Sequence, residues 1–394
     1  MSTQQMTSAD TAWLHMDRPT NPMVVNAVLW FDEQMDLERA RAVIGERLVG
    51  RFPRFRQRVV EPRMHHSIAD GIALARVLFS MTDEEPDAGI EPEGARGRSR
   101  GRLSGLVRPL KIGTHLAQQA MHEGFELLTH PLPELQDLAA EGAADTRALG
   151  RMLLTSREQR SALHGELGAR QKVAWTEHIA LKDVKAIGHA TGTTVNDVLV
   201  AATTGALRSF LAERHTPVDE VRAMVPFNLR PLDQPLPREL GNRFGLVYLD
   251  LPVGLRGPRQ RLDAVHRRMD AIKQSPEGAM SYGILSAIGV TPRQIEQRLV
   301  DLFASKSSVV VTNVPGPRQP VYFAGTRVAG VTSWVPAGGT IGLGVSIFSY
   351  GDKVTIGLRA DAGLIPDPDP ILVALERELA QLTALNPRST SKHR

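Results

Sequence analysis

The sequence of 394 residues contains no cysteine. Disulfides, thiolate zinc sites and a cysteine acyl-enzyme are therefore excluded. Aromatic residues make up only 5% of the chain, and no basic face carries interleaved aromatics, so there is little support for nucleic-acid binding. No apolar run reaches the roughly 18 residues of a membrane-spanning helix. The N-terminus also lacks the basic start and long apolar core of a signal peptide.

An excess of one charge is missing as well. Lysine and arginine total 47 against 43 acidic residues, which leaves a net charge of +4. This mildly basic balance suits an acidic small molecule or an anionic membrane surface. The hydrophobic fraction of 42% and charged fraction of 23% are typical of a soluble globular protein. The length is sufficient for two domains with separate cores.

The first third of the chain begins as a mixed α/β pattern. Residues 24–31 and 54–60 predict strands, residues 36–52 predict a helix capped by Asp36, and residues 71–79 predict a buried helix. From 82 to 111 the composition changes from acidic to arginine-rich with many glycines, which is typical of a linker. This linker is either a solvated tether or a contact for anionic lipid headgroups through Arg96, Arg98, Arg100 and Arg102. Residues 111–130 and 145–169 are helical in pattern.

A second alternation of strands and helices starts near residue 171. Strands are predicted at 172–181, 221–230, 244–253 and 307–317, and a hairpin at 339–361 turns at Gly351-Asp352. A helix that begins at 181 ends at Gly192, and a long apolar helix follows from about 194 to 214. The pattern predicts two lobes, each a mixed sheet with flanking helices, joined by a helical connector.

The stretch "RMHHSIADGIAL", residues 63–74, holds the residues that suggest chemistry. Adjacent side chains on a strand point to opposite faces, so His65 and His66 are poorly placed to share one metal, and no third ligand occurs at useful spacing. A general base needs only one anchored imidazole. Asp70 at the following turn fits a support of the local backbone, and Gly71 lets the chain bend closely. From the pattern alone, an ordinary strand-to-helix turn remains open beside a catalytic base.

This stretch resembles the HHxxxDG motif of the bacterial wax ester synthase/diacylglycerol acyltransferase family. The segments "DTAWLHMDRPTNPMVV", "TGTTVNDVLVAA", "MVPFNLRP", "GNRFG", "VVVTNVPGP" and "GTIGLGVSIFSYGDKVTIGLRADAGLIPDP" are similar to that family in the same order. The resemblance covers most of residues 9–80 and 171–380. It implies an α/β, two-lobed CoA-dependent acyltransferase fold like that of chloramphenicol acetyltransferase.

The resemblance also implies a reaction and its residues. A long acyl chain would pass from acyl-CoA, a co-substrate, to the hydroxyl of diacylglycerol or of a long-chain alcohol, with no cofactor and no metal. His66 matches the family's general base, and His65 would support it. Asp70 would be structural and paired with an arginine, for which Arg230 is the candidate, although Arg230 equally fits a solvated strand end.

Further residues follow from the same likeness. Asn196 and Asp197 match the family's Asn-Asp motif and would support the site, although either residue also fits a helix cap. The glycine-rich strands near 338–347 either line an acyl tunnel or pack as ordinary sheet. The expected location is cytoplasmic, at the surface of membranes or lipid droplets. A condensation-domain relative that handles carrier-bound acyl groups is a weaker reading, because the C-terminal segments resemble the lipid family more closely.

The sequence departs from this family before the histidine motif. Only "RVVEPRM" separates Gln57 from His65, where the family has a longer segment with a Pro-Leu-Trp motif and the strand that delivers the histidines. We therefore expect a truncated N-terminal lobe at 1–110, a helical connector at 111–170 and an intact C-terminal lobe at 171–394. Pro62 cannot donate to a sheet ladder, so residues 56–66 should be irregular and acyl transfer weak or absent. The alternatives are that "RQRVVEPRM" forms a continuous strand, or that the chain is a non-catalytic acyl-CoA-binding or lipid-binding remnant.

Overall fold

The computed structural model describes residues 7–56, 64–65, 69–88, 158–229, 237, 240–274, 281 and 293–385. The elements up to residue 83 are α1 (Ser8–His15), β1 (Val24–Phe31), α2 (Leu37–Val43), the π-helix η1 (Ile44–Val49), the 3₁₀ helix η2 (Pro53–Arg56), β2 (Met64–His65), α3 (Gly71–Phe79) and β3 (Thr82–Asp83). The elements from 171 to 251 are β4 (Gln171–Trp175), β5 (Ile179–Ala180), α7 (Leu181–Thr191), α8 (Val195–Glu213), β6 (Val221–Asn228) and β7 (Phe244–Leu251). The remaining elements are α9 (Pro258–Lys273), α11 (Arg293–Ala304), β8 (Val309–Pro315), β9 (Tyr322–Phe323), β10 (Thr326–Trp334), β11 (Leu343–Tyr350), β12 (Lys353–Asp361) and α12 (Asp369–Ala384).

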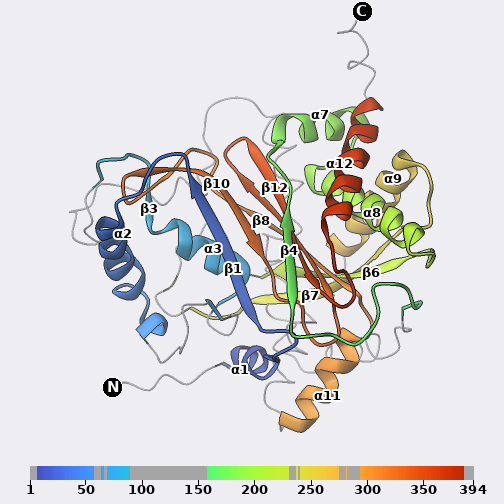
Figure 1. Ribbon diagram of the computed structural model, residues 1–394, viewed down its shortest axis with the longest axis horizontal. Coiled ribbons are helices and arrows are strands. Elements are labelled where there is room, and N and C mark those ends of the chain that lie inside the picture. The colour runs from blue at the N-terminus through green and yellow to red at the C-terminus, as the bar shows by residue number, and fades with distance from the viewer. Residues whose placement is uncertain are drawn as a thin grey trace, which may run out of the picture.

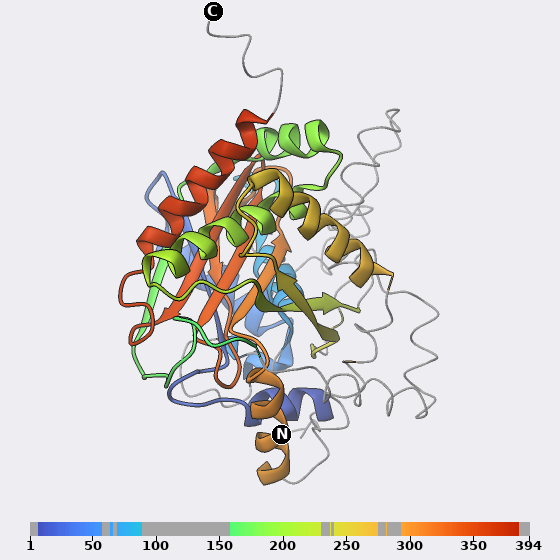
Figure 2. The ribbon, with the colours of Figure 1, turned by 90° about the vertical axis from the view of Figure 1, so that its right-hand side faces the viewer.

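A seven-stranded sheet forms the larger lobe. Six of its strands run in the order β4-β12-β11-β8-β6-β7, and β5 also pairs with β12. β8 is parallel to both β11 and β6, while the outer pairs are antiparallel. Helices α7, α8, α9 and α12 gather on one face of this sheet (Figures 1 and 2). A sheet with central parallel strands needs such a cover, because both of its faces must be shielded from water.

The helix α8 is buried along most of its length. It packs against α7, α9 and α12, and small residues in its middle turns allow these neighbours to approach closely. A Cβ atom at Gly205 would overlap the side chain of Glu378, which forms a buried ion pair with Arg261 of α9. The mostly apolar sequence of α8 therefore reflects a central helix that is covered along most of its surface.

The smaller sheet draws its strands from both halves of the chain. Its order is β2-β1-β10-β9-β3, and β10 pairs antiparallel with β1 from Asn26 opposite Trp334 to Trp30 opposite Gly330. Phe79 of α3 stacks on Tyr350 of β11 in a core that belongs to this smaller lobe. Residues 322–334, which belong by sequence to the predicted C-terminal lobe, thus complete the N-terminal sheet. The two lobes share part of their packing.

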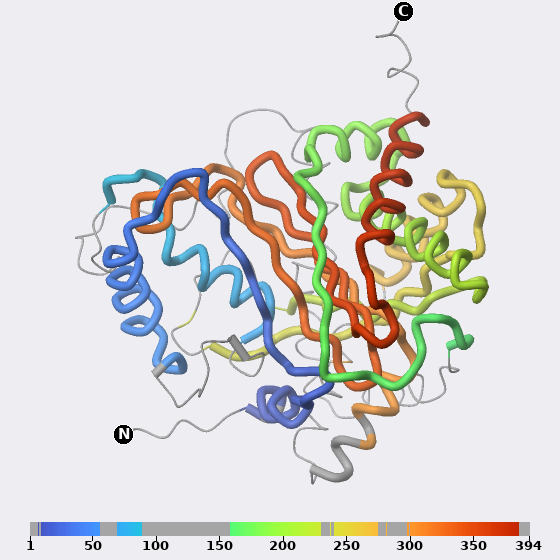
Figure 3. Tube along the Cα trace, viewed as in Figure 1, coloured from blue at the N-terminus to red at the C-terminus, as the bar shows by residue number. Residues whose placement is uncertain are grey.

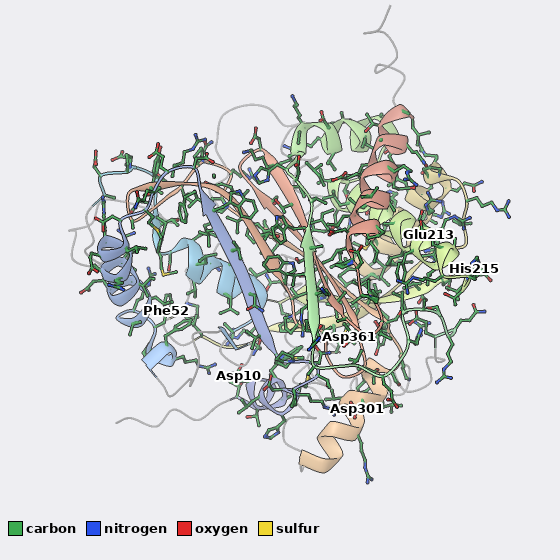
Figure 4. All side chains as sticks on the ribbon, viewed as in Figure 1. Asp10, Phe52, Glu213, His215, Asp301 and Asp361 are labelled. Atoms are coloured by element: carbon green, nitrogen blue, oxygen red, sulfur yellow. The ribbon has the colours of Figure 1, made fainter. Side chains whose placement is uncertain are left out.

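The helix α1 is fixed to the rim of the larger lobe by a buried carboxylate, labelled in Figure 4. Asp10 Oδ2 accepts a hydrogen bond from Arg54 Nη2 at 2.9 Å, and Asp10 Oδ1 accepts from the backbone and side-chain N–H groups of Asn242, each at 2.9 Å. Asp10 is fully buried. A buried charge of this kind requires such partners, so α1 is held firmly beside the start of β7.

Most predicted elements of the C-terminal half are confirmed. The hairpin turns at Gly351-Asp352, and α7 ends at Gly192, whose φ of 70° is the left-handed conformation that favours glycine. Asp36 caps α2 as predicted. No helix among the described residues is long and apolar enough to cross a bilayer.

Two local predictions are wrong. Residues 54–56 belong to the 3₁₀ helix η2 rather than to a strand, since Pro53 occupies the first position of a helical turn. Residues 158–169, the described part of the predicted 145–169 helix, are not helical, and glycines at 165 and 168 interrupt them. Residues 57–63, the linker around 96–102 and the predicted helix at 111–130 lie outside the described residues.

Candidate active site

A cleft of about 1180 Å³, counting the part open to solvent, lies where the smaller lobe meets the larger sheet. Trp13, Met16 and Ile72 contribute to its wall from the N-terminal segment, while β6, β7, β8 and α11 contribute from the other lobe. Most of the side chains that line it are apolar. An apolar lining of this kind suits a long hydrocarbon chain.

The helix α3 begins at this cleft and is capped by Asp70. Oδ1 of Asp70 accepts from the Ala73 N–H at 2.7 Å, which is the usual N-cap bond. Oδ2 accepts from the backbone N–H of Arg243 at 3.2 Å, at the entrance to β7 in the other lobe. Asp70 is buried, and its carboxylate caps α3 through one oxygen and joins α3 to the other lobe through the second.

The glycine after Asp70 lies in the wall of the cleft. Gly71 lines the cleft, and a Cβ atom built on it would meet no described atom within 4 Å. A side chain at this position would project into open space, so its absence keeps the cleft wide beside the motif.

The histidine motif enters the site from β2. Met64 pairs with Val25 and His65 pairs with Val24, so His65 ends a strand, as predicted. Among the described residues, the pairing covers two residues on each strand. The side chain of His65 is not described, and His66 lies outside the described residues, as does Arg230. The roles of these three residues stay predictions.

Asn196 connects α8 to the cleft. Its Oδ1 atom accepts from Nδ2 of Asn313 at 3.0 Å, and both side chains are buried. Asn313 lies on β8 and lines the cleft. This partner of Asn196 was missed from sequence, although an amide inside the apolar run of residues 309–314 is the signal that marks it, because a buried amide needs hydrogen-bond partners.

Asp197 faces the opposite direction, toward α9. It forms a capping box with Thr194, in which Asp197 Oδ2 accepts from the Thr194 N–H at 2.9 Å and Thr194 Oγ1 accepts from the Asp197 N–H at 3.2 Å. His266 Nδ1 lies 2.7 Å from the same Oδ2 atom. Asp197 is fully buried. The pair Asn196-Asp197 thus fixes the start of α8 between the cleft and α9.

The described wall of the cleft contains two ionisable groups, Asp70 and Tyr248. Burial raises the pKa of Tyr248, so its phenol stays neutral, and its O–H donates to the Phe303 carbonyl oxygen at 2.9 Å. Asp70 is held by backbone N–H groups on both oxygens. Neither group is free to take a proton from a substrate.

Two family models match the chain. The wax ester synthase/diacylglycerol acyltransferase catalytic domain matches residues 60–199, and the WS/DGAT C-terminal domain matches residues 240–383. The chain belongs to this acyltransferase family. The cleft walls supplied by α3, β7, β8 and α11 lie within the two matched regions of this acyltransferase.

Curated relatives agree with the family. This acyltransferase is 23% identical over 354 residues to a Mycobacterium tuberculosis protein named a probable diacylglycerol O-acyltransferase. The matched region covers 83% of this chain and 68% of the relative. It is 25% identical over 330 residues to the O-acyltransferase WSD of Acinetobacter baylyi, and this match covers 80% of this chain and 68% of the relative.

Solved structures show the fold. The wax ester synthase/diacylglycerol acyltransferase of Marinobacter aquaeolei matches this acyltransferase with a TM-score of 0.60 at 18% identity, over 97% of this chain and 99% of that chain. The starter condensation domain of rhizomide synthetase matches with a TM-score of 0.51 at 13% identity, over 98% of this chain and 94% of that chain. The predicted two-lobed α/β fold is confirmed.

The bond between Asn196 and Asn313 in this acyltransferase can be measured by a double-mutant cycle. Replacing both with alanine, singly and together, should give a coupling of about 0.5–1.5 kcal/mol in the free energy of unfolding. A control cycle pairs Asn313→Ala with Thr203→Ala, since Thr203 is buried on α8 but donates to the Leu199 carbonyl. A coupling as large in the control cycle would contradict a specific bond.

Proposed function

We propose that this acyltransferase moves a long-chain acyl group from acyl-CoA to the hydroxyl of a diacylglycerol or of a long-chain alcohol. The observation that carries the proposal is the large apolar cleft between the lobes, which opens beside Asp70 and Gly71, directly after the histidine motif. The names of the curated relatives, a diacylglycerol O-acyltransferase among them, support the choice of acceptor. Family membership favours this activity over a non-catalytic remnant.

The chemistry requires one base. The His66 imidazole would take the proton from the acceptor hydroxyl as its oxygen attacks the thioester carbonyl carbon. An ester C–O bond forms, the C–S bond breaks, and the departing thiolate of CoA receives that proton. A thioester is a reactive acyl donor, so no covalent enzyme intermediate is needed. A positioned base of this kind contributes about 10²–10⁴-fold to the rate.

The cleft walls suit such a reaction in a second way. Apolar side chains exclude water from the thioester, which favours transfer to the hydroxyl over hydrolysis. Tyr248 and Asp70 are committed to bonds within the protein, so they do not compete for the transferred proton. The largely apolar lining would therefore leave the histidine as the group that handles the proton.

A direct assay tests the proposed function. The purified full chain is mixed with palmitoyl-CoA and either dioleoylglycerol or hexadecanol, and the release of free CoA is followed together with the ester product. We expect CoA release to depend on an acceptor. Release that is equal with and without acceptor would indicate thioesterase activity, and no release with either acceptor would contradict the proposal.

We also propose that the protein docks on lipid surfaces from the water side, because both acceptors are insoluble in water. The arginines at 96–102 would contact anionic headgroups. Flotation with phosphatidylglycerol vesicles should recover the protein at low salt and lose it at about 1 M salt, where screening shortens to about 3 Å. Binding that is insensitive to salt and to lipid charge would remove these arginines from the explanation.

A further inference from the structure

Three segments of the larger lobe meet at the turn between β11 and β12. The Leu181 N–H, at the start of α7, donates to the Asp352 carbonyl oxygen at 2.8 Å. The Gly351 N–H donates to the Pro317 carbonyl oxygen, also at 2.8 Å. The start of α7, the hairpin turn and the chain that leaves β8 are thus fixed against one another, and Figure 3 shows the hairpin beside α7.

This junction brings together two cationic side chains. Lys185, one helical turn after Leu181, is half-buried, and Arg318, the residue after Pro317, is exposed. Burial and the nearby guanidinium of Arg318 lower the pKa of Lys185. Two cationic side chains that lie at one junction can contact the same anion. Lysine and arginine are the side chains that bind phosphate oxygens.

The junction lies at the end of a strand that lines the cleft. β8 contributes Val314 to the cleft wall, and Arg318 follows four residues later. Four residues of extended chain span at most about 14 Å. Next to Val314, the Oδ1 atom of Asn313 is buried and has no hydrogen-bond partner among the described residues. A buried acceptor of this kind is satisfied by a donor such as an amide N–H.

We propose that Lys185 and Arg318 form an anion subsite that holds the phosphates at the nucleotide end of acyl-CoA while the thioester lies in the cleft. The proposal rests on the proposed function, because it assigns one end of the donor in that reaction. The chemistry of CoA fits the separation, since its phosphates are joined to the thioester by a long arm that carries two amides. Oδ1 of Asn313 accepts from one of these amide N–H groups.

Two donors separate the phosphate contacts from the chemistry. Palmitoyl-CoA is compared with palmitoyl-pantetheine, which carries the same thioester without phosphate, in the wild-type chain and in the Lys185→Gln/Arg318→Gln variant. We expect the KM of the variant for palmitoyl-CoA to rise about tenfold or more, with kcat unchanged. Its KM for palmitoyl-pantetheine should stay at the wild-type value. The matched control Lys172→Gln/Arg377→Gln removes the same charges from exposed positions on β4 and α12 and should change neither KM.

Binding of adenosine 3′,5′-bisphosphate, measured by calorimetry, gives a readout independent of turnover. The wild-type chain should bind the bisphosphate. The Lys185→Gln/Arg318→Gln variant should bind it at least about tenfold more weakly. An unchanged KM for palmitoyl-CoA, or an equal rise for both donors, would overturn the subsite. If the Lys185→Gln/Arg318→Gln variant loses binding to phosphatidylglycerol vesicles while its KM for palmitoyl-CoA is unchanged, the pair binds lipid headgroups and the subsite is overturned. A wild-type chain that binds the bisphosphate but releases no CoA would contradict only the proposed function.

Discussion

Replacing His66 with alanine is expected to lower the rate of acyl transfer by about 10²–10⁴-fold, the usual contribution of a positioned general base. The alcohol is a poor nucleophile at neutral pH, and the described wall of the cleft offers no other group for its proton, since Asp70 and Tyr248 are already bonded within the protein. Initial rates of CoA release with diacylglycerol measure the effect, and circular dichroism checks that the variant folds.

The neighbouring histidine supplies the control. His65 ends β2, and consecutive strand residues point to opposite faces, so His65→Ala should retain more activity than His66→Ala. A wild-type rate in His66→Ala would show that the base lies elsewhere. A rate that falls equally in both variants would instead indicate that the pair acts through the packing of β2.

The rate of the wild-type chain also bears on the predicted shortening of the N-terminal lobe. β2 pairs with β1 over only Val24 and Val25, so little described structure holds the histidine motif from that side. A catalytic group needs support to within about 0.5 Å, and the expected weak transfer follows from that requirement. Turnover that matches a relative with the longer segment would show that residues 57–63 seat the motif well.

Elements whose signals are local were predictable from the sequence. The Gly351-Asp352 turn lies between two apolar strands, and Gly192 follows the last helical residue of α7, so turn and cap chemistry fixed both. By contrast, nothing in residues 326–334 indicates that β10 pairs with β1, about 300 residues earlier. Such pairing depends on how distant surfaces fit together. The 3₁₀ turn at 53–56 shows that an alternating pattern of arginine and apolar residues does not by itself define a strand.

The contacts of the candidate site also divide into those that the sequence predicts and those that it does not. The position of Asp70 before an apolar run predicts its capping role, because the cap lies within three residues of its partner. Its second bond, to Arg243, joins residues 173 positions apart. Asn313 reaches Asn196 across 117 positions. The sequence marks these polar residues as unusual in apolar surroundings, but only the fold shows which buried groups satisfy one another.

The second bond of Asp70 can be isolated by a conservative change. Asparagine caps a helix about as well as aspartate, so Asp70→Asn keeps the bond to the Ala73 N–H. Its amide NH₂ then faces the Arg243 N–H, where two donors meet and the bond between lobes is lost. We expect the free energy of unfolding to fall by about 1–3 kcal/mol, the cost of an unsatisfied buried group. Denaturant unfolding measures this change.

A matched control and a rate measurement decide what the change at Asp70 means. Asp36 caps α2 in an exposed position, and its Oδ1 atom alone accepts from the Glu38 and Arg39 N–H groups, so Asp36→Asn should alter stability by less than about 0.5 kcal/mol. The rate of acyl transfer should fall in Asp70→Asn but not in Asp36→Asn, because the start of α3 follows the histidine motif directly. If Asp70→Asn loses activity while its stability equals that of the wild type, the carboxylate has a chemical role, and the structural assignment of Asp70 is wrong.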